Sequence, residues 1–279
     1  MQNKRKYEHL ALVTDLDGTL LMPDKTLSSA DAAALADFRA NGGLFGIATG
    51  RGLQATKEFI DLLHPDLPVI LYNGAVLYDA KEERAVFTAH LPEGITPLLC
   101  ELMAKFPAVG AELLDENGVH IIQDGEYERR HLEITHIPLV FRQIGDMEPT
   151  RCMKALFAGS PEEIERMLSY VRKPAFEIVN ITRSHQWFLE ILPPDTNKGT
   201  ALSRLRTFLP DGTVIGASGD FDNDTAMLCS ADFCGCPANA QDSVREAVRN
   251  SVGFCSEKTC ADGFFADWTA AFLRRYEDA

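Results

Sequence analysis

The feature that most constrains the fold of this chain is a short apolar run that stops at two acidic residues. Leu10–Thr14 is almost wholly apolar, as expected of a strand buried on both faces of a sheet, and Asp15 and Asp17 follow it directly. Two more such strands are predicted at Leu44–Ala48 and Val69–Tyr72, and the segments between them have the apolar spacing of helices. This alternation of strands and helices predicts an α/β fold with a doubly wound, mainly parallel sheet.

The pattern changes in the middle of the chain. Paired short strands with turn sequences such as Asn117-Gly118 alternate with amphipathic helices such as Pro92–Phe106. Hairpins mixed with helices are typical of an α+β unit, and the parallel α/β rhythm returns after Pro193-Pro194. We therefore predict a core made of residues 1–83 and 189–279, with an α+β domain inserted at residues 84–188.

Polar residues also follow a later buried strand, which is predicted at Val214–Ala217. Asp220, Asn223 and Asp224 lie just past its end. Because ligand sites in open α/β sheets lie at the carboxyl ends of the strands, we expect this group to lie near the two acids of the first strand. Carboxylate and amide oxygens suit Mg²⁺, which binds one or two carboxylates together with phosphate and water. Capping of the next helix would account for one of these residues but not for the whole group.

Two further positions offer groups that would bind a phosphate. Thr49 ends the second strand, and Gly50 and Arg51 open the helix behind it, where a hydroxyl and exposed amide N–H groups would hold an anion. Lys198 begins a predicted helix and offers a fixed positive charge. Taken singly, Thr49 would be an ordinary cap residue and Lys198 a solvated surface lysine. The chain does not contain the Walker A motif, so a P-loop nucleotide site is not predicted.

Charge and cysteine content narrow the partners and the compartment. The formal net charge is −14, which disfavours binding to nucleic acid or to an anionic membrane. No apolar run approaches the ~20 residues that span a bilayer, and we find no secretory signal. The seven cysteines have no framework spacing, and we interpret Cys234 and Cys236 as buried thiols rather than zinc ligands. These features predict a soluble, cytoplasmic protein.

In chain order these groups resemble the motifs of the haloacid dehalogenase-like (HAD) phosphatase superfamily. The resemblance covers the whole chain and rests on Asp15-Leu16-Asp17-Gly18-Thr19, then Thr49, then Lys198, then Gly219-Asp220 with Asn223-Asp224. The insertion ahead of Lys198 is similar to the cap domain of the Cof-like sugar-phosphatase branch. This resemblance implies a Rossmann-like HAD core, an inserted α+β cap that selects the substrate, and Mg²⁺ as the cofactor.

The resemblance also implies a role for each residue. Asp15 would attack phosphorus and form an aspartyl-phosphate, while Asp17 would protonate the leaving alcohol and then activate water. Mg²⁺ would be held by Asp15, Asp220 and the backbone carbonyl of Asp17, and Thr49 and Lys198 would neutralise phosphoryl oxygens. Asn223 and Asp224 would orient waters of the metal or the phosphate. The substrate-binding residues expected are Thr49, Gly50, Arg51, Asn73, Lys198 and Asn223.

The predicted substrate is a small phosphorylated metabolite, with sugar phosphates as the first expectation. The candidate contacts from the cap, chosen because sugar hydroxyls need hydrogen-bond partners, are Arg129, His131, His136, Arg183 and His185. Two alternatives stay open from the residues alone. A phosphosugar mutase would use the same aspartyl-phosphate, and a non-catalytic sensor would bind a phospho-ligand without turnover, although Asp15 and Asp17 are both present.

Overall fold

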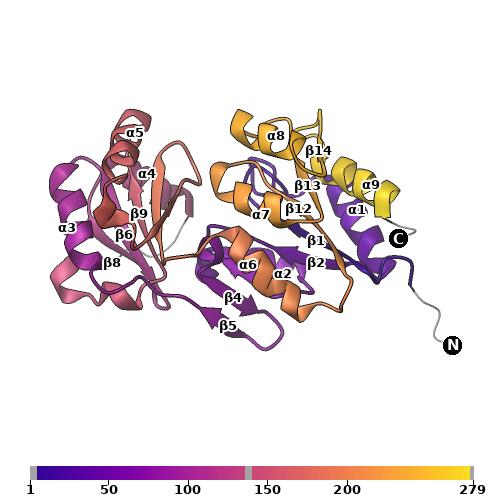
Figure 1. Cartoon of the computed structure of the whole chain (residues 1–279), viewed down its shortest axis with the longest axis horizontal. Coiled ribbons are helices and arrows are strands. Elements are labelled where there is room, and N and C mark those ends of the chain that lie inside the picture. Colours follow the sequence, from indigo (N-terminus) through magenta and orange to yellow (C-terminus); the bar gives the residue numbers. More distant parts are fainter. Residues whose placement is uncertain (1–4, 136–139, 277–279) are drawn as a thin grey trace.

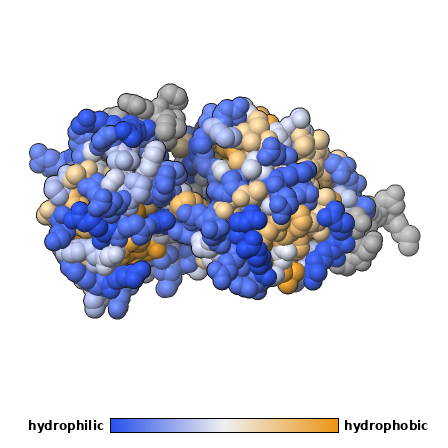
Figure 2. All heavy atoms as spheres, turned by 90° about the horizontal axis from the view of Figure 1, so that it is seen from above, coloured by the Kyte–Doolittle hydropathy of each residue, from blue (hydrophilic) through white to orange (hydrophobic). Residues whose placement is uncertain are grey.

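The computed structural model describes residues 5–135 and 140–276, without the side chains of residues 132–135. Two lobes lie side by side along the long axis of the molecule, and the first strand and the last helix belong to the same lobe (Figure 1). Hydrophilic residues cover most of the face seen in Figure 2. Within the described part of the chain, no helix combines the length and the apolar character needed to cross a membrane.

One lobe, the core lobe, is built on a five-stranded parallel sheet with the order β14-β13-β12-β1-β2. Its strands are β1 Leu10–Thr14, β2 Leu44–Ile47, β12 Val214–Ser218, β13 Phe233–Cys236 and β14 Gly253–Cys255. Leu10 and Leu12 of β1 join the apolar cluster on one face, and Ala11 and Val13 join the cluster on the other. Burial on both faces explains why β1 is a continuous apolar run.

Helices cover both faces of this sheet. One face carries α1 Ser29–Ala40, α2 Leu53–Leu63 and α9 Phe264–Tyr276, and the other carries α6 Lys198–Leu205, α7 Thr225–Ser230 and α8 Asp242–Arg249. Parallel strands need crossover connections, and these helices provide them. The predicted α/β fold with a doubly wound sheet is confirmed.

A small antiparallel sheet adjoins the core sheet. β3 Val69–Leu71, β4 Val76–Asp79 and β5 Arg84–Thr88 pair in this order. One parallel bridge, between Ala48 and Ile70, links β3 to the end of β2. The third predicted strand is therefore present, but it begins a separate sheet, because its hydrogen bonds go mainly to the hairpin that follows it.

The other lobe, the cap lobe, is built on a six-stranded sheet with the order β10-β11-β9-β6-β7-β8. β6 Gly110–Asp115, β7 Gly118–Gln123, β9 Lys154–Ala158, β10 Asn180–Thr182 and β11 Phe188–Leu192 pair antiparallel, and β8 Val140–Phe141 pairs parallel with β7. α3 Ile95–Lys105 and α5 Pro161–Tyr170 pack on the outer face of this sheet in a separate apolar cluster. α4 Glu126–Thr135 contacts β6 and β9.

Some elements of the cap lobe differ from the sequence prediction. The pattern does not predict α4, because charged residues outnumber apolar ones in that helix. The sequence pattern indicates one strand over Phe176–Thr182, whereas the structure has a 3-10 turn at Pro174–Phe176 and a shorter strand, β10.

The strand pairing also bears on where the inserted domain begins and ends. β5 pairs with β4, and β11 pairs with β9. The predicted domain limits at 83/84 and 188/189 would cut through these strand pairs. Few contacts should cross a domain boundary, so limits outside the paired strands fit better. We propose limits in the connections just after β5 and just after β11.

Candidate active site

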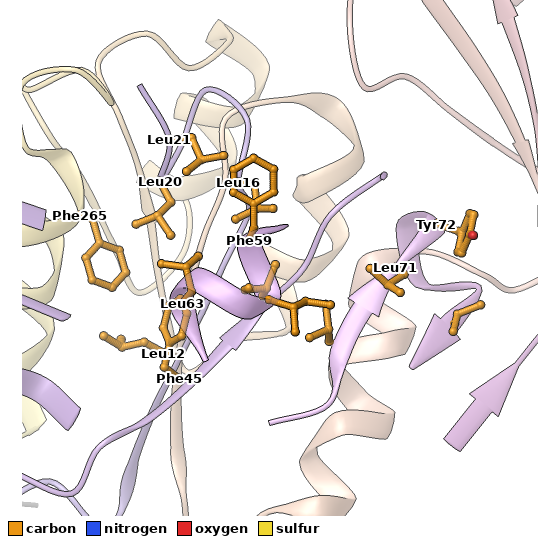
Figure 3. Close-up of a cluster of buried hydrophobic side chains, with 14 of the residues drawn as sticks. Leu12, Leu16, Leu20, Leu21, Phe45, Phe59, Leu63, Leu71, Tyr72 and Phe265 are labelled. Carbon is orange, nitrogen blue, oxygen red and sulfur yellow. The ribbon is translucent and has the colours of Figure 1, made fainter. Parts of the chain in front are cut away.

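The loop after β1 is anchored by leucines that point into the core. Leu16, Leu20 and Leu21 have at most 1% of their surface exposed and pack in the cluster that includes α2 (Figure 3). The backbone N–H groups of Leu20 and Leu21 both donate to the carbonyl of Leu16. This packing fixes the backbone that carries Asp15 and Asp17.

Asp15 is buried at the end of β1 and pairs with a buried lysine. Nζ of Lys198 lies 2.6 Å from Oδ1 of Asp15 and 2.6 Å from Oδ1 of Asp224. Burial raises the pKa of Asp15 to about 7, against the opposing charge of Lys198. Burial would lower the pKa of Lys198, but the two carboxylates outweigh this effect and raise it. Lys198 is therefore a fixed ammonium ion.

Asp220 reaches the same point from the end of β12. Its Oδ1 accepts a hydrogen bond of 3.0 Å from the hydroxyl of Thr19. A Cβ at position 18 would lie 2.5 Å from Oδ2 of Asp220, and Gly18 has a φ of +77°, so both the space and the backbone require glycine here. Burial raises the pKa of Asp220 well above its ordinary value, and the charges of Asp15 and Asp224 add to this effect.

The carboxylates converge in a way that fits a divalent cation. One oxygen each from Asp15, Asp220 and Asp224 lies within 4.8 Å of the others. Both oxygens of Asp224 already accept hydrogen bonds, one from Lys198 and the other from two backbone N–H groups. Oδ1 of Asn223 is buried and has no hydrogen-bond partner among the described residues. Crowded carboxylates suit a hard cation such as Mg²⁺, and Asn223 lines the same cavity.

The surroundings of Asp17 differ from those of Asp15, because Asp17 pairs with two cations, Arg51 and Lys25. Nε and Nη2 of Arg51 donate to its two oxygens at 2.6 and 2.7 Å, and Nζ of Lys25 lies 2.6 Å from Oδ1. Burial would raise the pKa of Asp17, but the hydrogen bonds and charges of Arg51 and Lys25 outweigh it and lower the pKa to about 2. Thr49 accepts a hydrogen bond of 3.1 Å from the backbone N–H of Arg51. The sequence prediction does not include Lys25.

Asn73 connects the core lobe to the cap lobe. Its backbone is left-handed, with a φ of 54°, which asparagine tolerates better than most residues. Its side-chain amide donates to the carboxylate of Glu190 on β11, and its Oδ1 accepts a hydrogen bond of 2.9 Å from Nδ2 of Asn223. The carbonyl of Gly50 accepts a hydrogen bond of 2.9 Å from Nζ of Lys154 on β9. Two positions of the core lobe are thus tied to the cap sheet.

A cavity of about 700 Å³ lies between the two lobes. The residues of the predicted site that line it are Asp15, Asp17, Thr49, Gly50, Arg51, Asp220 and Asn223. Asn73, Lys198 and Asp224 are not part of the lining and hold lining residues from behind. The structure therefore brings the predicted residues together, some on the wall of the cavity and the others directly behind it.

Only some of the predicted cap contacts line the cavity. His131 and His185 line the cavity. Arg129 is exposed and pairs with Asp124, and Arg183 pairs with Glu165, so neither belongs to the lining. The predicted contact at position 136 lies outside the described residues.

The cap lobe also contributes buried charged residues that the sequence analysis did not single out as cap contacts. Glu112, Lys154 and Glu190 line the cavity from β6, β9 and β11, and each is at most 3% exposed. The sequence could have indicated these residues, because each is a charged residue inside a largely apolar strand. Such a residue is costly to bury without a partner or a function.

Comparison with known proteins agrees with this geometry. Residues 12–263 match the family model of the haloacid dehalogenase-like hydrolases, and the chain belongs to this family. Pyridoxal phosphate phosphatase YbhA of Escherichia coli is 26% identical over 254 residues, which cover 87% of this chain and 92% of the relative. The 5-amino-6-(5-phospho-D-ribitylamino)uracil phosphatase YitU of Bacillus subtilis is 23% identical over 278 residues, which cover 95% and 96%.

Solved structures show the same fold. A HAD subclass IIB sugar phosphatase superposes with a TM-score of 0.80 at 20% identity, covering 94% of this chain and 98% of the other. The resemblance to the Cof-like HAD proteins is confirmed. The chain is a HAD-like hydrolase whose named relatives are phosphatases, and HAD hydrolases generally use Mg²⁺.

Proposed function

We propose that this chain is a Mg²⁺-dependent phosphatase that hydrolyses small phosphomonoesters, sugar phosphates among them, through an aspartyl-phosphate on Asp15. The main support is a carboxylate that lines the cavity, lies 2.6 Å from a buried lysine and adjoins two further acids. The names of the relatives also support small substrates, since they refer to pyridoxal phosphate, a phosphoribitylamino compound and sugar phosphates.

The first half-reaction transfers the phosphoryl group to the protein. A carboxylate oxygen of Asp15 attacks phosphorus, the bond from phosphorus to the ester oxygen breaks, and the leaving alcohol takes a proton from Asp17. The hydroxyl of Thr49 donates to a phosphoryl oxygen, and Lys198, behind Asp15, adds a positive charge close to the transferred group, because charge stabilisation dominates phosphoryl-transfer catalysis. In the second half-reaction Asp17 removes a proton from water, which attacks phosphorus and releases inorganic phosphate from Asp15.

The two roles of Asp17 need two protonation states. In this structure its pKa is about 2, because Arg51 and Lys25 outweigh the effect of burial, so the group is ready to act as a base. A bound phosphate dianion would attract Arg51 and Lys25 and draw them away from Asp17. The pKa of Asp17 would then rise because its burial would be less compensated, which favours the acid role.

The metal would be held by Asp15, Asp220 and the backbone carbonyl of Asp17. When bound, Mg²⁺ supplies the positive charge that lets a carboxylate nucleophile and an anionic phosphate approach each other. Asn223, with its unpartnered Oδ1, would orient a water or the phosphate. We assign Asp224 to positioning, because its two oxygens hold Lys198 and the backbone of the loop at Asp220.

The test is phosphate release from p-nitrophenyl phosphate by the purified chain. Activity should require Mg²⁺, disappear in EDTA and disappear in Asp15→Asn. The control Asp211→Asn removes the same charge from an exposed loop and should behave as the wild type. Asp17→Asn should accumulate phosphorylated Asp15, detectable by mass spectrometry. Wild-type activity in Asp15→Asn would refute the proposed nucleophile, and a requirement for a bisphosphate activator would favour a mutase.

A further inference from the structure

The inner face of the cap sheet is charged where it meets the cavity. Alternate residues of each strand face opposite sides of a sheet. Two residues of each strand line the cavity: Glu112 and Leu114 on β6, Lys154 and Leu156 on β9, and Phe188 and Glu190 on β11. The residues between them, which include Leu113, Ala155 and Leu189, belong to the outer cluster under α3 and α5. Glu112 and Glu190 flank Leu156 in the register of the three strands.

Glu112 is paired with a second buried carboxyl group on α4. Gly110 allows this approach, because a Cβ at position 110 would lie 2.3 Å from the Cβ of Glu128. Burial, together with the charge and hydrogen bond of Glu112, raises the pKa of Glu128 to about 10. Oε2 of Glu112 and both oxygens of Glu128 are buried, and no other side chain or backbone N–H among the described residues donates to them. The raised pKa keeps Glu128 protonated at neutral pH, so it adds no negative charge beside the carboxylate of Glu112.

The charged groups around this pair do not neutralise it. Nζ of Lys154 lies 3.3 Å from Oε1 of Glu190, so its charge already has a partner. Nε2 of His131 lies 4.0 Å from Oε1 of Glu112, but burial lowers the pKa of His131, so the ring is neutral. Arg51 is bound through two nitrogens to a core carboxylate. Among the described residues, the cap side of the cavity keeps one buried negative charge in excess.

Aromatic rings line the same cavity as Glu112. Trp187 and Phe188 line the cavity together with His131 and His185. The ring centroids of His131 and Phe188 are 4.7 Å apart, and those of His185 and Trp187 are 4.8 Å apart. The faces of such rings attract cations, and the effect is larger where water is excluded. A carboxylate next to aromatic faces is a recognition surface for a protonated amine.

We propose that Glu112, held by Glu128, selects phosphomonoesters whose leaving group carries a protonated amino group. This inference rests on the proposed phosphatase function and specifies its substrate class. A buried carboxylate without a cation is costly, and an incoming ammonium group supplies the missing charge as well as hydrogen-bond donors. A neutral sugar alcohol supplies donors without the charge.

The test compares D-glucosamine 6-phosphate with D-glucose 6-phosphate, which differ by one amino group in place of a hydroxyl. At neutral pH the wild type should show a kcat/KM for the amino compound at least about tenfold higher, since a hydrogen bond to a charged group contributes on the order of one factor of ten or more. In Glu112→Gln the ratio should fall to near one. Glu116→Gln, which removes the same charge from an exposed position of the cap lobe, should keep the wild-type ratio.

Binding provides a readout that does not depend on turnover. Dissociation constants of both sugars are measured by calorimetry on Asp15→Asn, with and without Glu112→Gln, and folding is checked by circular dichroism. Tighter binding of the amino sugar that is lost with Glu112 supports the inference. Equal dissociation constants, or a preference that survives Glu112→Gln, overturn it. Hydrolysis by Asp15→Asn refutes the proposed mechanism instead, so the two failures are distinguishable.

Discussion

Replacing Lys198 with methionine should destabilise the fold by an amount that depends on pH. The side chain of Lys198 has no exposed surface and lies 2.6 Å from carboxylate oxygens of both Asp15 and Asp224. Methionine has a similar length without the charge, so the variant leaves these two carboxylates buried beside Asp220 without a cation. Removing one partner of a buried ion pair costs about 3–5 kcal/mol. At about 2–4 °C per kcal/mol, Tm at neutral pH should fall by roughly 6–20 °C.

The pH dependence follows from the carboxyl group of Asp15. Its folded-state pKa of about 7 lies above the model value of 3.8, so the folded state binds more protons than the unfolded state between these values. Stability therefore falls as pH rises through this window. Without Lys198 the influence that holds this pKa down is lost, so the fall continues to higher pH. The difference in Tm between variant and wild type should therefore grow as pH rises through about 7, where Asp15 loses its proton in the wild type but keeps it in the variant.

The assay is thermal unfolding followed by circular dichroism in EDTA, across a series of pH values. Lys57→Met is the matched control, because Lys57 is exposed and its ion pair with Asp61 spans 3.6 Å, and exposed pairs contribute little. Added Mg²⁺ should narrow the difference for Lys198→Met, since the cation supplies positive charge among the same carboxylates. A variant that is as stable as the wild type at neutral pH, or a deficit that does not change with pH, would refute this reasoning.

Three further predictions concern the cap sheet and the metal. Gly110→Ala should lower the free energy of unfolding by about 1–3 kcal/mol in urea, because its Cβ would lie 2.3 Å from that of Glu128; Gly145→Ala, with open space around it, is the control. Glu190→Gln should cost about 3 kcal/mol in the same assay, because it leaves buried Lys154 without its charged partner. Saturating Mg²⁺, at about a hundredfold above its Kd, should stabilise the wild type by about 2.7 kcal/mol in a thermal-shift titration. Asp220→Asn should lose most of that shift, and an undiminished shift would place the metal elsewhere.

Much of the core lobe follows from local patterns in the sequence. A continuous apolar run can be buried only where both faces of a strand are covered, so Leu10–Thr14 is predicted and observed as a central strand. Asp15 and Asp220 end neighbouring parallel strands, and the carboxyl ends of such strands share one edge of the sheet. The convergence of these acids could therefore be expected without any coordinates.

The cap lobe and the pairing of charges depend on tertiary structure. The sequence shows that Lys25 and Arg51 are cations but not that both bind Asp17, because side-chain partners are set by how separate segments pack. Glu112 and Glu128 lie on a strand and a helix whose contact depends on Gly110. Backbone patterns thus determine where Asp15 and Asp220 lie, whereas burial and the number of nearby charges, which set the pKa values, arise only when the lobes are assembled.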